Sequence, residues 1–244
     1  SLSAHSDRHS TAWPFCPLGG VETLPESARR LAESGMGYRG IVISGPGPSG
    51  RDFAQICASA ERIARETGIM LCASLGILSD EQAVTLKQAG FSSYHHNLET
   101  ARSFYSSICT THAYEIRIET VKKAKKAGLR VCSGGLFGLG ESWKGRFELS
   151  ETLQQLDVDS IPVNFLMAVP GTRLETAHGL SLPEALGLIA VLRLMHPARD
   201  IVLCGGRGKA PREGARTASV AGADGTLVGD YLTENGHPCR RELQ

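Results

Sequence analysis

Short β-rich apolar runs alternate with amphipathic helical stretches along almost the whole chain, and this alternation constrains the fold most strongly. A strand that recurs every roughly 20–40 residues, with a helix in between, predicts parallel βαβ units. The expected strands are Tyr38–Ser44, Ile69–Leu75, Phe91–His95, Leu129–Ser133, Ser160–Leu166, Asp200–Cys204 and Gly225–Val228. The expected helices are Leu24–Ser34, Arg51–Thr67, Ser79–Ala89, Tyr114–Ala127, Ser142–Leu156, Leu182–Met195 and about Arg212–Ala221.

The number of strands decides between the folds that this alternation permits. A closed parallel barrel needs about eight strands, and one fewer is expected here. The stretch Ser1–Gly20 has the character of a loop before the first helix, and in this pattern such a loop follows a strand. We therefore expect a (βα)8 barrel that lacks its first strand, with a doubly wound open sheet as the alternative. No linker or change in composition divides the pattern, which favours one domain over residues 1–244.

Composition excludes several classes of protein. The chain has 26 Lys plus Arg and 25 Asp plus Glu, a net charge of +1 that argues against a nucleic-acid groove or a polybasic membrane patch. No apolar run approaches the ~18–20 residues of a membrane span, and no signal-peptide pattern is present. The 7 cysteines form no CxxC pair, which disfavours a zinc ribbon or a secreted disulfide framework. Reduced thiols and a cytoplasmic location are therefore expected.

Polar residues occur at the carboxyl ends of five expected strands, the edge where parallel barrels hold their chemistry. Two strands carry a cysteine, a third runs into a His-His-Asn-Leu-Glu segment, a fourth contains an asparagine and the last leads to an arginine. The sequence therefore predicts that these side chains converge at one mouth of the barrel. The residues concerned are Cys72, His95, Asn97, Glu99, Cys132, Asn164 and Arg207.

Each of these residues also has a purely structural interpretation. A lone cysteine in a strand usually behaves as a small apolar core residue, and this interpretation is adopted for Cys16, Cys57, Cys109 and Cys239. Cys72 and Cys132 are different because two strand-borne thiols can face one lumen together. The buried amide of Asn164 must be hydrogen-bonded, either by the core or by a ligand. His95 and His96 point to opposite faces of their strand, so at most one of them faces the lumen.

Several segments resemble the biotin synthases, a family of radical S-adenosylmethionine (SAM) enzymes built on a (βα)8 barrel. The segments are YHHNLET (Tyr94–Thr100), ICTTHAYEIRIET (Ile108–Thr120), VCSGGLFGLGE (Val131–Glu141), PVNFL (Pro162–Leu166) and GGR (Gly205–Arg207). They occur in the family's order over nearly the whole chain. The part from roughly residue 160 to 240 resembles the carboxyl-terminal part of those enzymes, within the same single domain.

The resemblance implies a role for each matching residue. Asn97 and Glu99 would hold the SAM ribose with Arg117 nearby, and His95 and Asn164 would contact the ureido ring of dethiobiotin. Cys72, Cys132 and Arg207 would bind the auxiliary iron–sulfur cluster, a [2Fe–2S] cluster or a variant of it, that supplies sulfur. No side chain is assigned as an acid, base or nucleophile, because the cofactors carry the chemistry.

The sequence departs from the family's pattern in three places. The C-x3-C-x2-C triplet that binds the SAM-cleaving [4Fe–4S] cluster is absent from the chain, and we expect it just upstream of Ser1. Where relatives have a third cysteine for the auxiliary cluster, the nearest residue here is Gly40, and Cys204 is a candidate replacement ligand. His95 stands where relatives have asparagine. We therefore expect this chain to be inactive alone.

The leading functional hypothesis is sulfur insertion that converts dethiobiotin to biotin. The alternatives are a related radical SAM enzyme of the hydrogenase-maturation or methylornithine-forming type, and a cluster-free barrel that acts as a binding module. The related enzymes do not need the pair Cys72 and Cys132, which favours the leading hypothesis. The resemblance further implies an electron donor such as flavodoxin or ferredoxin, iron–sulfur assembly proteins as partners, and a homodimer.

Overall fold

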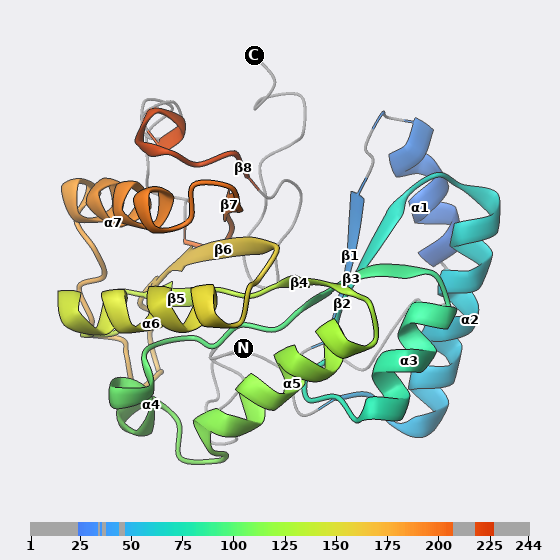
Figure 1. Ribbon diagram of the computed structural model, residues 1–244, viewed down its shortest axis with the longest axis horizontal. Helices are drawn as coiled ribbons and strands as arrows, with labels where there is room; N and C mark the ends of the chain where they lie inside the picture. The colour runs from blue at the N-terminus through green and yellow to red at the C-terminus, as the bar shows by residue number, and fades with distance from the viewer. Residues whose placement is uncertain (1–23, 34, 36–37, 44–46, 207–217, 227–244) are drawn as a thin grey trace.

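The backbone forms one parallel sheet whose strands follow one another in sequence order (Figure 1). The computed structural model describes residues 24–33, 35, 38–43, 47–206 and 218–226. The strands are β1 (Tyr38–Val42), β2 (Met70–Ser74), β3 (Phe91–His95), β4 (Arg130–Cys132), β5 (Gly135–Phe137), β6 (Ser160–Phe165), β7 (Asp200–Leu203) and β8 (Gly225–Thr226). Because β4 and β5 both pair with β6, they are successive parts of one position in the sheet.

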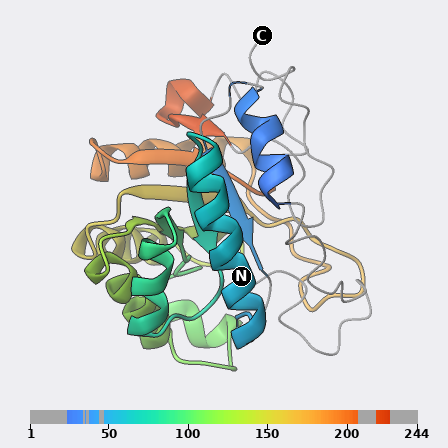
Figure 2. The same ribbon diagram turned by 90° about the vertical axis from the view of Figure 1, so that its right-hand side faces the viewer.

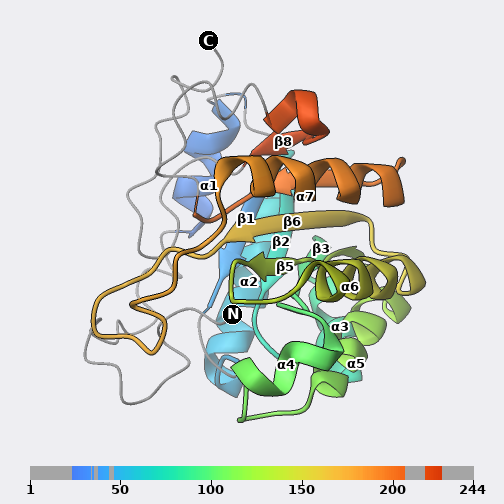
Figure 3. The same ribbon diagram turned by 90° about the vertical axis from the view of Figure 1, so that its left-hand side faces the viewer.

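Helices connect the strands and cover one face of the sheet (Figures 1 and 2). They are α1 (Leu24–Glu33), α2 (Gly50–Glu66), α3 (Asp80–Gln88), α4 (Arg102–Ile108), α5 (Tyr114–Lys126), α6 (Trp143–Gln155) and α7 (Leu182–Met195). The hydrophobic core lies between this helical layer and the sheet. The connection from β6 to α7 projects from the body on the side away from α3 and α5 (Figure 3).

The strand order decides between the two expected architectures. A doubly wound sheet reverses its order at a switch point, whereas here β1, β2, β3, β4, β6, β7 and β8 lie side by side in sequence. Among the described residues, β1 pairs only with β2 and β8 only with β7, so the curled sheet is open between its first and last strands. The barrel-type prediction of seven parallel strand positions, with a gap beside the first, is therefore confirmed.

Two elements differ from the sequence-based expectation. The strand expected at Leu129–Ser133 is interrupted, and a second short segment, β5, follows it. The helix α4 was not expected, because its seven residues carry neither a capping side chain nor a clear apolar face. Of the helix expected at Arg212–Ala221, residues 212–217 lie outside the described part, and residues 218–221 are helical.

Strand alternation assigns side chains to the two faces of the sheet. The outer face, against the helices, carries core residues such as Leu71, Ala73, Tyr94, Val131, Ile161, Val163, Ile201 and Leu203. The residues between them therefore face the inner, concave side. The register places Gly40 beside Cys72, Cys72 beside Ser93, and His95 beside Cys132 on that side. The inner face is thus where the expected ligands gather.

Candidate functional site

Three cysteines occupy inner-face positions near the carboxyl ends of β2, β4 and β7. Cys72 is buried, and Cys132 and Cys204 are half-buried. Cys132 interacts electrostatically with both of the other thiols, so the three form one cluster across the concave side. Burial and the neighbouring Cys72 raise the pKa of the Cys132 thiol well above its ordinary value. In the absence of a metal this thiol therefore holds its proton firmly.

The side chain of His95 lies within this thiol cluster. Its Nδ1 atom is 3.4 Å from Cys132 Sγ, the position that the β3–β4 register dictates. Burial lowers the pKa of His95 to about 4, so the imidazole is neutral at pH 7. The neighbouring His96 points to the opposite face and stacks on Tyr94 at 6.4 Å between ring centroids. The prediction that only one of the two histidines faces the lumen is confirmed.

Asn164 is hydrogen-bonded to backbone on both sides of β6. Its Nδ2 donates to Gly135 O at 3.2 Å, and its Oδ1 accepts from Gly205 N at 3.0 Å. The buried amide therefore ties β5 to the turn after β7. Each of these amide atoms still has capacity for one further hydrogen bond, so the contacts are compatible with a ligand role as well as a structural one.

Glycines at the end of β4 are required by the approach of neighbouring strands. A Cβ added at Gly134 would lie 2.0 Å from Pro162 O, and one at Gly135 would lie 2.8 Å from Glu99 O. From sequence alone such a Gly-Gly pair fits either a turn or the close approach of a ligand. In the structure, the two glycines let the neighbouring main chain come close. As a result, the segment after β3 packs against β5 and β6.

That segment carries the two residues expected to hold SAM. Asn97 Oδ1 accepts a hydrogen bond from Gly134 N at 3.2 Å, which fixes the turn after β3. Glu99 follows with φ of 72°, a left-handed conformation that is uncommon for a residue other than glycine. Its carbonyl accepts from Leu136 N at 2.8 Å, so the sheet holds this strained backbone in place. Such strain is concentrated at functional sites.

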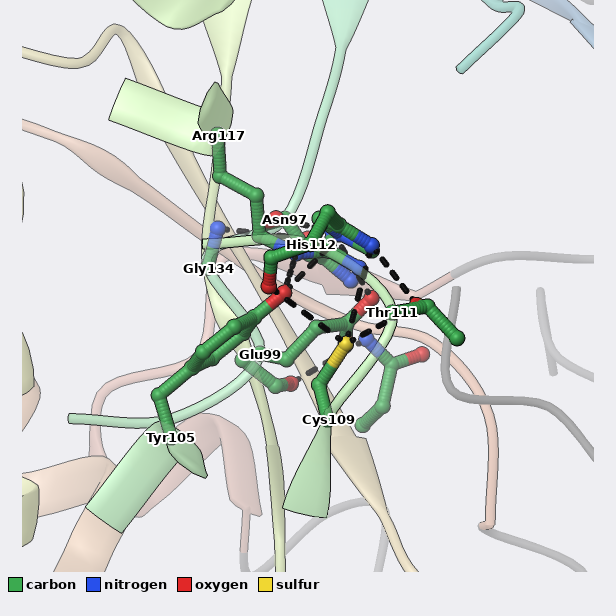
Figure 4. Close-up of polar contacts among 10 residues, drawn as sticks. Asn97, Glu99, Tyr105, Cys109, Thr111, His112, Arg117 and Gly134 are labelled. Atoms are coloured by element: carbon green, nitrogen blue, oxygen red, sulfur yellow. Dashed lines mark hydrogen bonds and ion pairs between the residues drawn. The ribbon is translucent and has the colours of Figure 1, made fainter. Parts of the chain in front are cut away.

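Arg117, on α5, joins the same cluster from the outer side (Figure 4). Its Nη1 donates to Asn97 O at 2.9 Å and forms an ion pair with Glu99 Oε1 at 3.5 Å. Both charged side chains are almost fully buried, at 5% and 3% exposure, so neither is compensated by water. Burial opposes the charge of Arg117, but Glu99 and Tyr105 outweigh it and raise its pKa. The three residues assigned to SAM therefore form one network.

The sequence analysis missed four side chains that extend this network (Figure 4). Arg117 Nε donates to the Tyr105 hydroxyl at 2.8 Å, and that hydroxyl lies 2.9 Å from His112 Nε2. Thr111 and Cys109 follow, with their side chains 3.4 Å apart. Burial would raise the pKa of Cys109, but hydrogen bonds, chiefly from Thr111, leave it lowered. All four lie in or beside α4, the helix that the sequence pattern did not reveal.

The structure therefore places the predicted residues in two adjoining groups. One group contains Asn97, Glu99 and Arg117, and the other contains Cys72, His95, Cys132 and Cys204 on the inner face, with Asn164 on the same face of β6. Arg207 lies outside the described residues. Within the described part, no three His, Cys, Asp or Glu side chains are close enough to bind a single metal ion. The thiols are thus spaced more widely than a mononuclear site requires.

Two family models match the chain. The model of the radical SAM superfamily matches residues 8–153, and the model of the biotin and thiamin synthesis associated domain matches residues 162–244. Together with the curled parallel sheet and the buried Asn97–Glu99–Arg117 network, these matches define a radical SAM protein.

Curated relatives specify the class further. A biotin synthase of Nitratidesulfovibrio vulgaris (strain Hildenborough) is 51% identical over all of this chain and 67% of the relative. A biotin synthase of Geotalea uraniireducens (strain Rf4) is 45% identical over all of this chain and 74% of the relative. The chain belongs to the biotin synthase family.

Solved structures support the fold. A methylornithine synthase (PylB) superimposes with a TM-score of 0.75 at 22% identity, covering 91% of this chain and 67% of that protein. The hydrogenase maturase HydG from Carboxydothermus hydrogenoformans gives a TM-score of 0.79 at 17% identity, over 94% of this chain and 56% of that protein. At these identities the likeness concerns architecture alone. No helix in the described ranges is both long and apolar enough to cross a membrane.

Proposed function

We propose that the protein carries out the reaction of its family, the insertion of sulfur into dethiobiotin to form biotin. The observation that carries this proposal is the 45–51% identity to biotin synthases over the whole chain. The solved structures of a methylornithine synthase and a hydrogenase maturase are only 17–22% identical. The inner-face pair Cys72 and Cys132, which the resemblance assigns to the auxiliary cluster, points the same way.

The buried network after β3 is proposed as the SAM site. Its fit rests on the Glu99 carboxylate, whose backbone is held in a strained conformation and which faces the Arg117 guanidinium at 3.5 Å. A carboxylate accepts hydrogen bonds from two vicinal hydroxyls, which suits the ribose of SAM. Arg117 faces Glu99 as its buried cationic partner, and Asn97 anchors the turn. These residues therefore bind and orient the cofactor.

The inner-face thiols are proposed as ligands of the auxiliary iron–sulfur cluster. Their wide spacing fits a cluster, which spans several ångströms, better than a single ion. Cys72 and Cys132 are the core of the ligand set, with Arg207 or Cys204 completing it. Gly40, beside Cys72 in the register, offers no ligand on β1. We therefore expect a [2Fe–2S] cluster or a variant with a different ligand set.

Bound SAM and iron–sulfur clusters would supply the radical chemistry and the sulfur atom. The chain's own residues bind, orient and exclude water. His95 and Asn164, near the thiol cluster, are proposed to bind the ureido ring of dethiobiotin, because a neutral imidazole and an amide match its paired donors and acceptors. The [4Fe–4S] cluster that cleaves SAM would take its ligands from a C-x3-C-x2-C triplet, which this sequence does not contain.

We propose one barrel domain over residues 1–244, whose part from roughly residue 160 to 240 is the family's carboxyl-terminal region. Flavodoxin or ferredoxin as electron donor, iron–sulfur assembly proteins and a second copy in a homodimer are the proposed partners. A cytoplasmic location fits the reduced thiols that such clusters require.

The cluster assignment is tested by anaerobic reconstitution of this chain with iron and sulfide. We expect the wild-type chain to retain a cluster, measured by iron and sulfide content and by its visible absorption. Cys72→Ala and Cys132→Ala should each lose most of it, because the loss of one thiolate leaves an open, labile iron. Cys57→Ala is the matched control, since Cys57 is buried on α2 away from the inner face. Equal iron content in all variants would contradict the assignment and show that Cys72 and Cys132 serve only core packing.

A further inference from the structure

The Tyr105 hydroxyl is the contact that fixes the guanidinium of Arg117. Arg117 Nε donates to it at 2.8 Å, and Nη1 donates to Asn97 O at 2.9 Å. The contact with Glu99 is longer, at 3.5 Å. The two short bonds hold the planar guanidinium in one orientation, and the carboxylate therefore meets it without being tightly bound by it. Tyr105 comes from α4 and Arg117 from α5, so this bond also joins two helices.

The bond from Arg117 fixes the role of the Tyr105 oxygen as an acceptor, because arginine only donates. The Tyr105 proton then has two neighbouring acceptors, His112 Nε2 at 2.9 Å and the Cys109 thiol. A neutral His112 that carries its proton on Nδ1, 2.9 Å from Thr111 Oγ1, is the form that accepts it. Burial raises the pKa of Tyr105, and burial and Arg117 lower that of His112. Both groups therefore keep the protonation states that this order requires.

We propose that Tyr105 and His112 are positioning residues, which orient Arg117 and through it present the Glu99 carboxylate to the two ribose hydroxyls of the adenosyl ligand. This inference rests on the proposed SAM site. Without the Tyr105 hydroxyl, Nε would lack its buried acceptor, and the guanidinium would turn to the nearest anion. That anion is Glu99. The ion pair would then tighten and the carboxylate would no longer face the ribose.

The competing explanation is that Tyr105 serves only the core. Its ring packs edge-on against Tyr114 at 5.2 Å and against His112 at 6.1 Å. Tyr105→Phe separates the two explanations, because it keeps the ring and removes only the hydroxyl. Tyr114→Phe is the matched control, since no hydrogen bond joins the Tyr114 hydroxyl to Arg117, Asn97 or Glu99. Both changes remove one oxygen from the same aromatic cluster.

The test measures how well the chain distinguishes a ribose from a deoxyribose. The probes are 5′-methylthioadenosine and its 2′-deoxy analogue, which need no iron, and affinities are measured by titration calorimetry. We expect the wild-type chain and Tyr114→Phe to prefer the ribose probe by about tenfold, the value of one good hydrogen bond. Tyr105→Phe should reduce this preference to about twofold or less.

Variants of His112 provide a second test of the positioning role. His112→Leu should lower the ribose preference as Tyr105→Phe does, and His112→Gln should restore it, because the amide oxygen accepts from the tyrosine. The double change Tyr105→Phe/His112→Leu should cost no more than either single change, since the two residues act through one chain of hydrogen bonds. Thermal unfolding of each variant identifies any that fails to fold.

The outcomes separate this inference from the function on which it rests. A wild-type chain that does not prefer the ribose probe would refute both the ribose role of Glu99 and the positioning role. A wild-type preference that persists undiminished in Tyr105→Phe and His112→Leu would refute the positioning role alone. A loss in both variants with retention in Tyr114→Phe and His112→Gln supports it.

Discussion

At the scale of single residues, backbone contact rather than side-chain chemistry explains the most restricted positions. The Cβ that a substitution would add at Gly134 lies 2.0 Å from Pro162 O and 3.0 Å from Pro162 C, which are main-chain atoms of β6 that cannot rotate away. Nothing in the sequence distinguished this glycine from a turn glycine. It is needed because β4 and β5 approach β6 so closely there that only a hydrogen atom fits.

We therefore expect Gly134→Ala to destabilise the fold by about 2–4 kcal/mol, because the strands must move apart to accept the methyl group. Gly50→Ala is the control, since an added Cβ there meets nothing within 4 Å. That change should be neutral or slightly stabilising, as alanine is the better helix former. Urea unfolding followed by circular dichroism measures both. A Gly134→Ala variant as stable as the wild type would contradict the steric account.

At the scale of elements, the sequence predicted what periodicity and capping encode and missed what tertiary context encodes. The starts of α3 and α7 are readable in the sequence, because Ser79 forms a capping box with Gln82 and Pro183 stands in the first turn of α7. The helix α4 is too short for periodicity to show, and it depends on Tyr105 packing into the core. The residues Cys72 and Asn97 were found because strand ends are readable from sequence. The partnership of Tyr105 with Arg117 was not, because it joins two helices through side chains alone.

The junction of α6 and α7 carries a titratable contact. His196, which ends α7, is 4% exposed, and its Nε2 lies 2.9 Å from Ser150 Oγ on α6. Burial is the main cause that lowers the pKa of His196 below 6.5. The unfolded chain therefore binds the proton more readily, so stability is full above about pH 6.5 and falls as the pH drops below it.

We expect the wild-type chain to be less stable at pH 5.5 than at pH 7.5, and His196→Gln to lose less stability between the two. The glutamine keeps a hydrogen bond to Ser150 but does not titrate. The exposed His178→Gln should show the pH dependence of the wild type. Urea midpoints at both pH values give the comparison. A His196→Gln variant whose stability falls as steeply as that of the wild type would show that another group is responsible.

At the scale of the whole molecule, the curled sheet brings two groups of site residues together, although its described strands do not close into a barrel. The network after β3 reaches the mouth from the rim, and the thiols of β2, β4 and β7 occupy the concave face. Each group uses its own side chains, so we expect the two proposed cofactor sites to assemble independently. The sequence contains the thiols of the concave face but not the triplet that would hold a SAM-cleaving cluster.

The 244-residue chain should therefore form no 5′-deoxyadenosine from SAM under reducing conditions, even when its inner-face thiols are loaded with iron and sulfide. Iron analysis and product chromatography on the same reconstituted sample test this. A chain that carries the family's C-x3-C-x2-C segment is the positive control. Turnover of SAM by the chain as given would show that cleavage does not depend on that triplet.

The close backbone approaches around β6 also set limits for anyone who redesigns this site. On one side Gly134 touches Pro162, and on the other a Cβ at Gly206 would lie 2.0 Å from Phe165 O. The spacing of β6 from both neighbours is therefore fixed by main chain, and no choice of side chain can widen it. A library aimed at new substrates should hold these two glycines constant, together with Asn164, whose amide ties β5 to the turn after β7, and vary His95 and Cys204 on the concave face.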